Sequence, residues 1–108
     1  MMRRASMTLS ACLAVAAWSF SMPAHANVDL ADKSACLNCH DVNKKMVGPA
    51  FKAIAEKYKG RADAAAYLAE KISKGGAGVW GTITMPGMPQ VAPADVQTLS
   101  QWIAKGAN

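Results

Sequence analysis

The sequence is poor in cysteine, in aromatic residues and in long hydrophobic runs. Its 108 residues include 3 cysteines and 6% aromatic residues. The apolar stretch at 9–20 is shorter than the roughly 20 residues that cross a bilayer, so we expect no membrane anchor. Two cysteines lie three positions apart and the third lies near the start, which excludes a disulfide framework. No strand pattern is visible, which excludes a thioredoxin-like pair in a βαβ unit.

Acidic residues are also few, with 7 against 12 basic residues and a formal net charge of +5. The arginine-rich and aromatic elements that read nucleic acid are missing, so we expect no nucleic-acid partner. A modest positive charge is instead compatible with an acidic protein partner.

The first 26 residues have the pattern of a cleaved secretory signal. A pair of arginines precedes the apolar stretch, and Ala24-His25-Ala26 supplies a small-x-small cleavage site. Lipoprotein cleavage before Cys12 is disfavoured because almost no apolar run precedes it. Twin-arginine export lacks the hydrophobic residue expected soon after the pair. We therefore expect a signal peptide at 1–26, one domain at 27–108 and a bacterial periplasmic location.

The most informative segment is Cys36-Leu37-Asn38-Cys39-His40. Cys-x-x-Cys-His is the attachment signature of a c-type haem. On a helix these three side chains share one face, so two thiols can join one porphyrin while the imidazole reaches its iron. A structural zinc site wants four Cys or His ligands, and the mature chain offers three. The motif predicts one covalent haem c, with Cys36 and Cys39 as thioethers and His40 as an axial iron ligand.

The rest of the mature chain predicts an all-α fold of four to five short helices. Apolar residues at helical spacing, with caps and glycine stops, indicate these segments. A glycine cluster at 75–78 breaks one helix, and a proline-rich loop follows at 79–93. Asp29 and Asp63 are the expected N-caps. Trp102 continues the apolar stripe of the last segment and is expected in the core. The expected helices are 30–40, 50–59, 63–74 and 94–105.

A second axial ligand is expected from a methionine, because a thioether opposite a histidine raises the reduction potential of haem iron. The mature chain holds Met46, Met85 and Met88. Met46 is too close to His40 in sequence to reach the opposite face of the porphyrin. Met85 and Met88 lie in the proline-rich loop, where fixed φ angles hold a side chain in place. Either could instead fill a gap in the core, and the residues alone do not separate them.

Several motifs in order make the whole mature chain resemble the small bacterial class I cytochromes c of the c-551/c-552 type. The resemblance implies a class I cytochrome c fold, Met85 as the distal ligand and the Pro49 carbonyl as acceptor for the His40 imidazole. The motifs are residues 36–40, Lys45-Met46-Val47-Gly48-Pro49-Ala50, Gly78-Val79-Trp80-Gly81, Met85-Pro86 and Gln97-Thr98-Leu99 with Trp102.

Two further residues and one departure follow from this resemblance. Trp80 is implied to reach a haem propionate through its indole N–H, the alternative being a core aromatic. Lys71 matches a basic position near a propionate, the alternative being a solvated lysine. The family commonly reads Met-Pro-Pro-Asn where this chain reads Met85-Pro86-Gly87-Met88. Gly87 is expected to loosen the loop, and Met88 becomes an alternative ligand to Met85.

The predicted function is electron transfer rather than catalysis, because His40 and Met85 leave the iron no vacancy. We expect a monomeric periplasmic carrier whose donor and acceptor are redox proteins of a respiratory chain, such as a terminal oxidase, nitrite reductase or cytochrome peroxidase. The alternative is a haem sensor or peroxidase-like protein whose distal methionine dissociates. Lysines around the expected haem either steer partners or only solvate the surface: Lys33, Lys44, Lys45, Lys52, Lys71 and Lys74.

Overall fold

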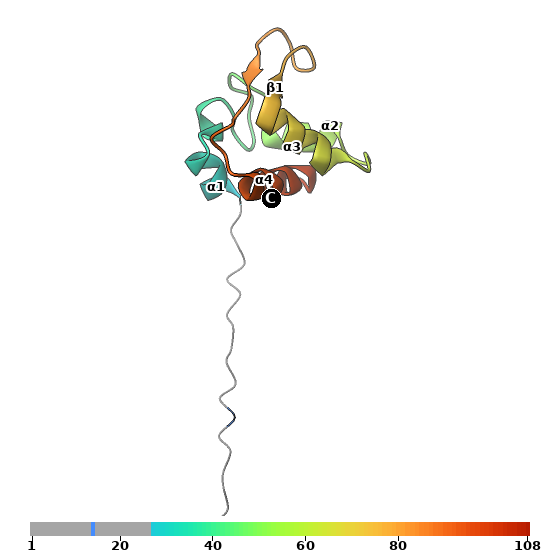
Figure 1. Cartoon of the computed structure of the whole chain (residues 1–108). Coiled ribbons are helices and arrows are strands. Elements are labelled where there is room, and N and C mark those ends of the chain that lie inside the picture. The colour runs from blue at the N-terminus through green and yellow to red at the C-terminus, as the bar shows by residue number, and fades with distance from the viewer. Residues whose placement is uncertain (1–13, 15–26) are drawn as a thin grey trace, which may run out of the picture.

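The computed structural model describes residue 14 and residues 27–108. Apart from residue 14, the expected signal peptide therefore lies outside the described residues. The described chain forms four α-helices, one 3₁₀ helix and two short strands (Figure 1). In chain order these elements are α1 (Val28–Lys33), η1 (Cys36–Asn38), α2 (Phe51–Lys57), α3 (Ala64–Lys74), β1 (Gly75–Gly76), β2 (Met85–Pro86) and α4 (Pro93–Ala104).

The expectation of a small fold of four to five short helices is confirmed. The two strands were not expected, because two residues are too few to show any alternation of apolar and polar side chains. They pair antiparallel, with Gly75 opposite Pro86 and Gly76 opposite Met85. Among the described residues, no helix is both long enough and apolar enough to cross a membrane.

The expected helix at 30–40 is wrong in its second half. α1 ends at Lys33, and the amide of Ser34 donates to the Leu30 carbonyl. Ala35 then adopts the left-handed conformation with φ 64°, which interrupts the α-helical path at a cost of about 1–2 kcal/mol. The helix also begins earlier than expected, so Asp29 lies in its first turn, where it complements the helix dipole.

The other three helices lie within one residue of their expected starts and within two of their expected ends. α4 begins with Pro93, whose missing amide proton costs nothing at a first helical position. Asp63 occupies the N-cap position of α3 but makes no capping hydrogen bond. Its carboxylate instead pairs with Arg61, with an N–O distance of 2.5 Å. The capping role expected for Asp63 is therefore wrong.

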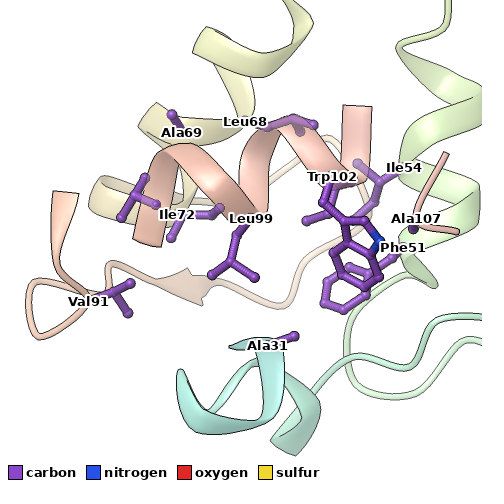
Figure 2. Packing of buried hydrophobic residues seen from close by; sticks show 12 residues of the cluster. Ala31, Phe51, Ile54, Leu68, Ala69, Ile72, Val91, Leu99, Trp102 and Ala107 are labelled. Atoms are coloured by element: carbon purple, nitrogen blue, oxygen red, sulfur yellow. The ribbon is translucent and has the colours of Figure 1, made fainter. Parts of the chain in front are cut away.

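The core lies where α3 and α4 cross, and α1 and α2 close its sides. Leu68, Ala69 and Ile72 of α3 face Leu99 of α4, while Trp102 lies beside Phe51 (Figure 2). Trp102 is buried, as the stripe on its helix predicted. Each buried leucine or isoleucine contributes about 1.5–3 kcal/mol, so this crossing is the rigid platform for the loops above it.

Candidate haem site

A cavity that is partly open to solvent lies against α2 and α3. Its walls come from residues 39–40 and 47–49, from one face of α3 and from the segment 76–86. The residues predicted from sequence that line the cavity are Cys39, His40, Pro49, Lys71, Trp80 and Met85.

His40 is the buried polar group of this wall, with 8% of its surface exposed. Its Nδ1 lies 2.7 Å from the carbonyl oxygen of Pro49. Because a carbonyl can only accept, Nδ1 carries the proton and donates it. The Nε2 lone pair is then free for a metal, which is the usual orientation of a histidine ligand held by a backbone acceptor.

The loop after His40 holds this geometry through its own hydrogen bonds. The Asp41 carboxylate accepts from the amides of Asn43 at 2.8 Å and Lys44 at 3.0 Å. These two amides hold the pKa of Asp41 below its ordinary value. Farther along, the Gly48 amide donates to the Cys39 carbonyl at 2.7 Å, which closes the loop onto the motif.

Gly48 allows the loop to lie directly against the imidazole. A Cβ at this position would lie 2.5 Å from Cε1 of His40 and 2.8 Å from Nδ1, closer than real contacts permit. Any other residue would therefore push the ring or the Pro49 carbonyl out of place. Sequence reasoning used Gly48 only as part of a family motif and missed this contact.

An aromatic stack supports His40 from behind. The Phe51 ring stacks on the imidazole at 5.1 Å between centroids, with 20° between the planes. Trp102 meets Phe51 edge-on at 5.5 Å, and its Nε1 donates to the backbone oxygen of Asn108 at 3.0 Å. The sequence predicted a core position for Trp102 but not its link to His40 through Phe51. The link joins the candidate iron ligand to the centre of the core.

The two cysteines are placed differently. Cys39 is exposed and lines the cavity, whereas Cys36 is half-buried and packs against the hydrophobic core. Burial raises the pKa of the Cys36 thiol. The motif lies on the turn η1, where the Cys36 carbonyl accepts from the amides of both Cys39 and His40. The α-helix predicted for the motif is therefore wrong, because residues 36–38 form a 3₁₀ turn, and of the two cysteines only Cys39 is among the residues that line the cavity.

The two loop methionines are also separated. Met85 lies on β2 and lines the cavity. Met88 does not line it and packs against the hydrophobic core instead. The residues alone did not separate Met85 from Met88 as the candidate ligand. In the structure the two have different surroundings, with Met85 at the cavity and Met88 against the core.

Trp80 lies at the exposed margin of the cavity, with 43% of its surface accessible. This exposure excludes the core alternative for Trp80. The ammonium of Lys57 lies 5.4 Å from the centre of its ring. Lys71 is half-buried and lines the cavity, with its ammonium 5.3 Å from the centre of the Tyr67 ring. A fully solvated position for Lys71 is therefore also excluded.

A pair of tyrosines completes the wall near these cations. The hydroxyl of Tyr58 donates to that of Tyr67 at 3.4 Å. Burial, followed by this hydrogen bond, raises the pKa of Tyr58 to about 12. The Arg61 guanidinium lies 4.1 Å from the centre of the Tyr67 ring. Both tyrosines are half-buried, line the cavity and also pack against the hydrophobic core.

The donors around the cavity fit a c-type haem. An imidazole with a free Nε2 and a thioether are both suited to haem iron, and the lining is mostly apolar, as a flat hydrophobic cofactor requires. A small helical domain with Cys-x-x-Cys-His at the wall of such a cavity is a c-type haem protein.

Comparisons with known proteins agree with this class. The sequence profile of the family Cytochrome c matches residues 28–107. The chain is 53% identical over 79 residues to cytochrome c-552 of Hydrogenobacter thermophilus, which covers 72% of this chain and 79% of that protein. It is 52% identical over 80 residues to cytochrome c-552 of Nitrosomonas europaea, covering 74% and 78% of the two chains. The chain therefore belongs to the cytochrome c family, close to its c-551/c-552 members.

A solved structure supports the same placement. The crystal structure of wild-type Nitrosomonas europaea cytochrome c552 is similar with a TM-score of 0.72 at 50% identity, covering 74% of this chain and 99% of that one. As a member of the family the protein carries a covalently attached haem c and is an electron carrier, not an enzyme. The predicted family, fold class and cofactor are thus confirmed.

Proposed function

We propose that this protein is a periplasmic monohaem cytochrome c that shuttles single electrons between redox proteins of a respiratory chain. In this proposal Cys36 and Cys39 form the two thioether bonds, and His40 and Met85 are the axial iron ligands. The observation that carries it is that His40, with Nε2 free, lines the same cavity as Met85. The bound haem supplies a one-electron couple in which iron alternates between Fe(III) and Fe(II).

The protein holds the two iron ligands in place and keeps other molecules from the iron. The Pro49 carbonyl fixes the tautomer of His40, and Phe51 holds the plane of the ring. Two protein ligands leave no coordination position for a substrate, and ligands held in place keep structural change during electron transfer small. These are the properties that an electron carrier needs.

Trp80 and Lys71 are proposed to bind the haem propionates. Both line the cavity, and both carry a polar group on an apolar body, so they can contact a porphyrin edge and its carboxylates together. A Trp80→Phe variant tests the tryptophan, because it keeps an aromatic ring, although a smaller one, and removes the indole N–H. The proposal expects the variant to alter the pH dependence of the reduction potential, and an unchanged dependence would remove this role.

Location and partners complete the proposal. Residues 1–26 serve as the export signal and residues 27–108 as the haem domain. The donor and acceptor are redox proteins, with a terminal oxidase, nitrite reductase or cytochrome peroxidase as candidate partners of a monomeric carrier. The lysines named above would steer such partners, so electron-transfer rates should fall as ionic strength rises. Rates that stay flat would remove the steering role.

The alternative of a sensor or peroxidase-like protein needs a methionine that leaves the iron. Gly87 and Met88 suggested it, yet Met88 packs against the core and does not line the cavity. Carbon monoxide discriminates between the two functions. Slow or absent binding to the reduced protein supports the carrier, and rapid binding supports the open site.

The direct test of the proposal is the visible spectrum and mass of protein made in cells that attach haem c. We expect a pyridine haemochrome spectrum of haem c, a mass that includes one haem, and the methionine–iron absorption band in the oxidised protein. A bare polypeptide mass in periplasmic material would overturn the proposal. A haem protein without the methionine–iron band would overturn the assignment of Met85.

A further inference from the structure

The segment that carries Met85 also closes the carboxyl end of α3. The last carbonyls of a helix have no partner within the helix and need one outside it. The Ile72 carbonyl accepts from the Met88 amide at 2.9 Å, and the Lys71 carbonyl accepts from the Gly75 amide. Because β1 follows α3 directly and pairs with β2, the Met85 strand is held at the end of this helix (Figure 1).

Two glycines allow the backbones to meet there. A Cβ on Gly87 would lie 2.7 Å from the Ser73 carbonyl oxygen and 3.0 Å from the Lys74 carbonyl carbon. A Cβ on Gly75 would lie 2.6 Å from the Gly87 amide nitrogen and would collide with the Met85 carbonyl. Backbone atoms cannot move aside as a flexible side chain can. Gly87 is therefore a close contact and not the loose point expected from the sequence.

Met88 fixes the same segment from the other side. Its side chain is half-buried against the hydrophobic core, and the Val91 amide donates to its carbonyl at 3.1 Å. Val91 is itself buried in that core. One residue thus joins the helix end through its amide and the core through its side chain, whose sulfur accepts a hydrogen bond from the Gln90 side chain at 3.7 Å.

We propose that Gly87 and Met88 are positioning residues that anchor Met85, so that the thioether stays at the cavity and leaves it rarely. The inference rests on the proposed function, because it concerns the residence of Met85 on the iron. In this arrangement Met88 is an anchor and not a spare ligand. Release of Met85 requires the segment to separate from the carboxyl end of α3.

The experiment uses the haem-loaded protein and imidazole as an external ligand that competes with Met85 for oxidised iron. The variants Gly87→Ala and Met88→Ala disturb the two contacts separately. Met88→Leu conserves volume but removes sulfur. Gly60→Ala is the matched control, because Gly60 has φ +82° with open space around it, so alanine strains the backbone away from the segment.

The anchor predicts that Gly87→Ala and Met88→Ala raise the rate of imidazole binding by roughly tenfold or more, because local opening becomes easier. Met88→Leu should keep the rate within about twofold and leave the methionine–iron band unchanged. Gly60→Ala should lower the unfolding temperature and leave the rate unchanged. Hydrogen exchange of the residue 88 amide should accelerate in Gly87→Ala and stay slow in Gly60→Ala.

Two results would overturn the anchor. One is an imidazole rate that stays at the wild-type value in both Gly87→Ala and Met88→Ala. The other is loss of the methionine–iron band in Met88→Leu, which would make Met88 the ligand. If Gly87→Ala does not fold, Met88→Ala and Met88→Leu still decide the question. A wild-type protein without bound haem would defeat the proposed function itself, which is a separate outcome.

Discussion

The two walls of the cavity that carry the candidate ligands are built in opposite ways. The His side, residues 36–51, places its imidazole against an aromatic pair that reaches the centre of the core. The Met side, residues 75–91, holds its thioether on a two-residue strand whose contacts are mainly backbone to backbone. His40 is buried, whereas most of the segment from Ala77 to Thr84 is exposed.

This difference shows which contacts hold each candidate ligand in place. A ligand tied to the core cannot be disturbed without cost to the whole domain. A ligand on an exposed segment can open locally while the helices stay packed. Changes on the His side should therefore alter global stability and coordination together, and changes on the Met side should alter coordination first.

The largest expected effect is that of Met85→Ala on the iron. Loss of the thioether should abolish the methionine–iron band and lower the reduction potential by a sizeable part of the roughly 0.8 V that axial ligands span. Met46→Ala is the control, because Met46 is 45% exposed and does not line the cavity. Spectroscopy and a redox titration provide the measurement. A Met85→Ala protein that keeps the band would contradict the assignment.

Phe51→Ala should produce the largest loss of global stability. The ring is 3% exposed and contacts both His40 and Trp102, and removal of a buried aromatic ring costs about 3–5 kcal/mol. Denaturant unfolding of the haem-loaded protein measures this loss. On the Met side, the exposed Thr82 provides a control, and Thr82→Ala should stay within about 0.5 kcal/mol. Equal effects of the two changes would break the comparison between the two sides.

Gly48→Ala should have the next largest effect and should act on both properties. The new Cβ would meet the imidazole, and a forced contact of this kind costs about 1–3 kcal/mol. The unfolding free energy and the spectrum of the haem should therefore change together. Gly60→Ala is the control outside both sides, since Gly60 has φ +82° and no neighbouring atom. It should cost stability through backbone strain alone, with an unaltered spectrum.

The sequence predicted the parts of the molecule whose signals are local. The apolar stripe of α4 located Trp102, and residues 36–40 identified the covalent haem c. It did not predict the break at Ala35, because alanine is the best helix former and carries no sign of a left-handed conformation. Tertiary contacts decide that conformation, and Cys36, just after the break, packs half-buried against the core.

The sequence also did not predict contacts between backbone segments that are far apart in the chain. The sequence suggested that Gly87 is a flexible position, because glycine can adopt many backbone conformations. In the structure it is instead the point where the Met85 segment contacts the backbone at the end of α3. Tyr58 and Tyr67 pack against the core and also line the cavity, because an amphipathic ring suits both surroundings. The type of a residue indicates what its side chain can do chemically. Which surface that side chain faces is determined only by how the helices pack.

The smallest expected effect concerns acid and the loop that carries Pro49. The lowered pKa of Asp41 means that its carboxylate stabilises the folded state above its ordinary pKa of about 4. That contribution disappears as the pH falls through the lowered value. Asp41→Asn keeps an acceptor oxygen but cannot titrate. We expect wild type to unfold at a higher temperature than Asp41→Asn at neutral pH, and the difference to shrink in acid. Because other carboxylates titrate alike in both proteins, they cancel, and a difference independent of pH would show that Asp41 does not hold this loop by its charge.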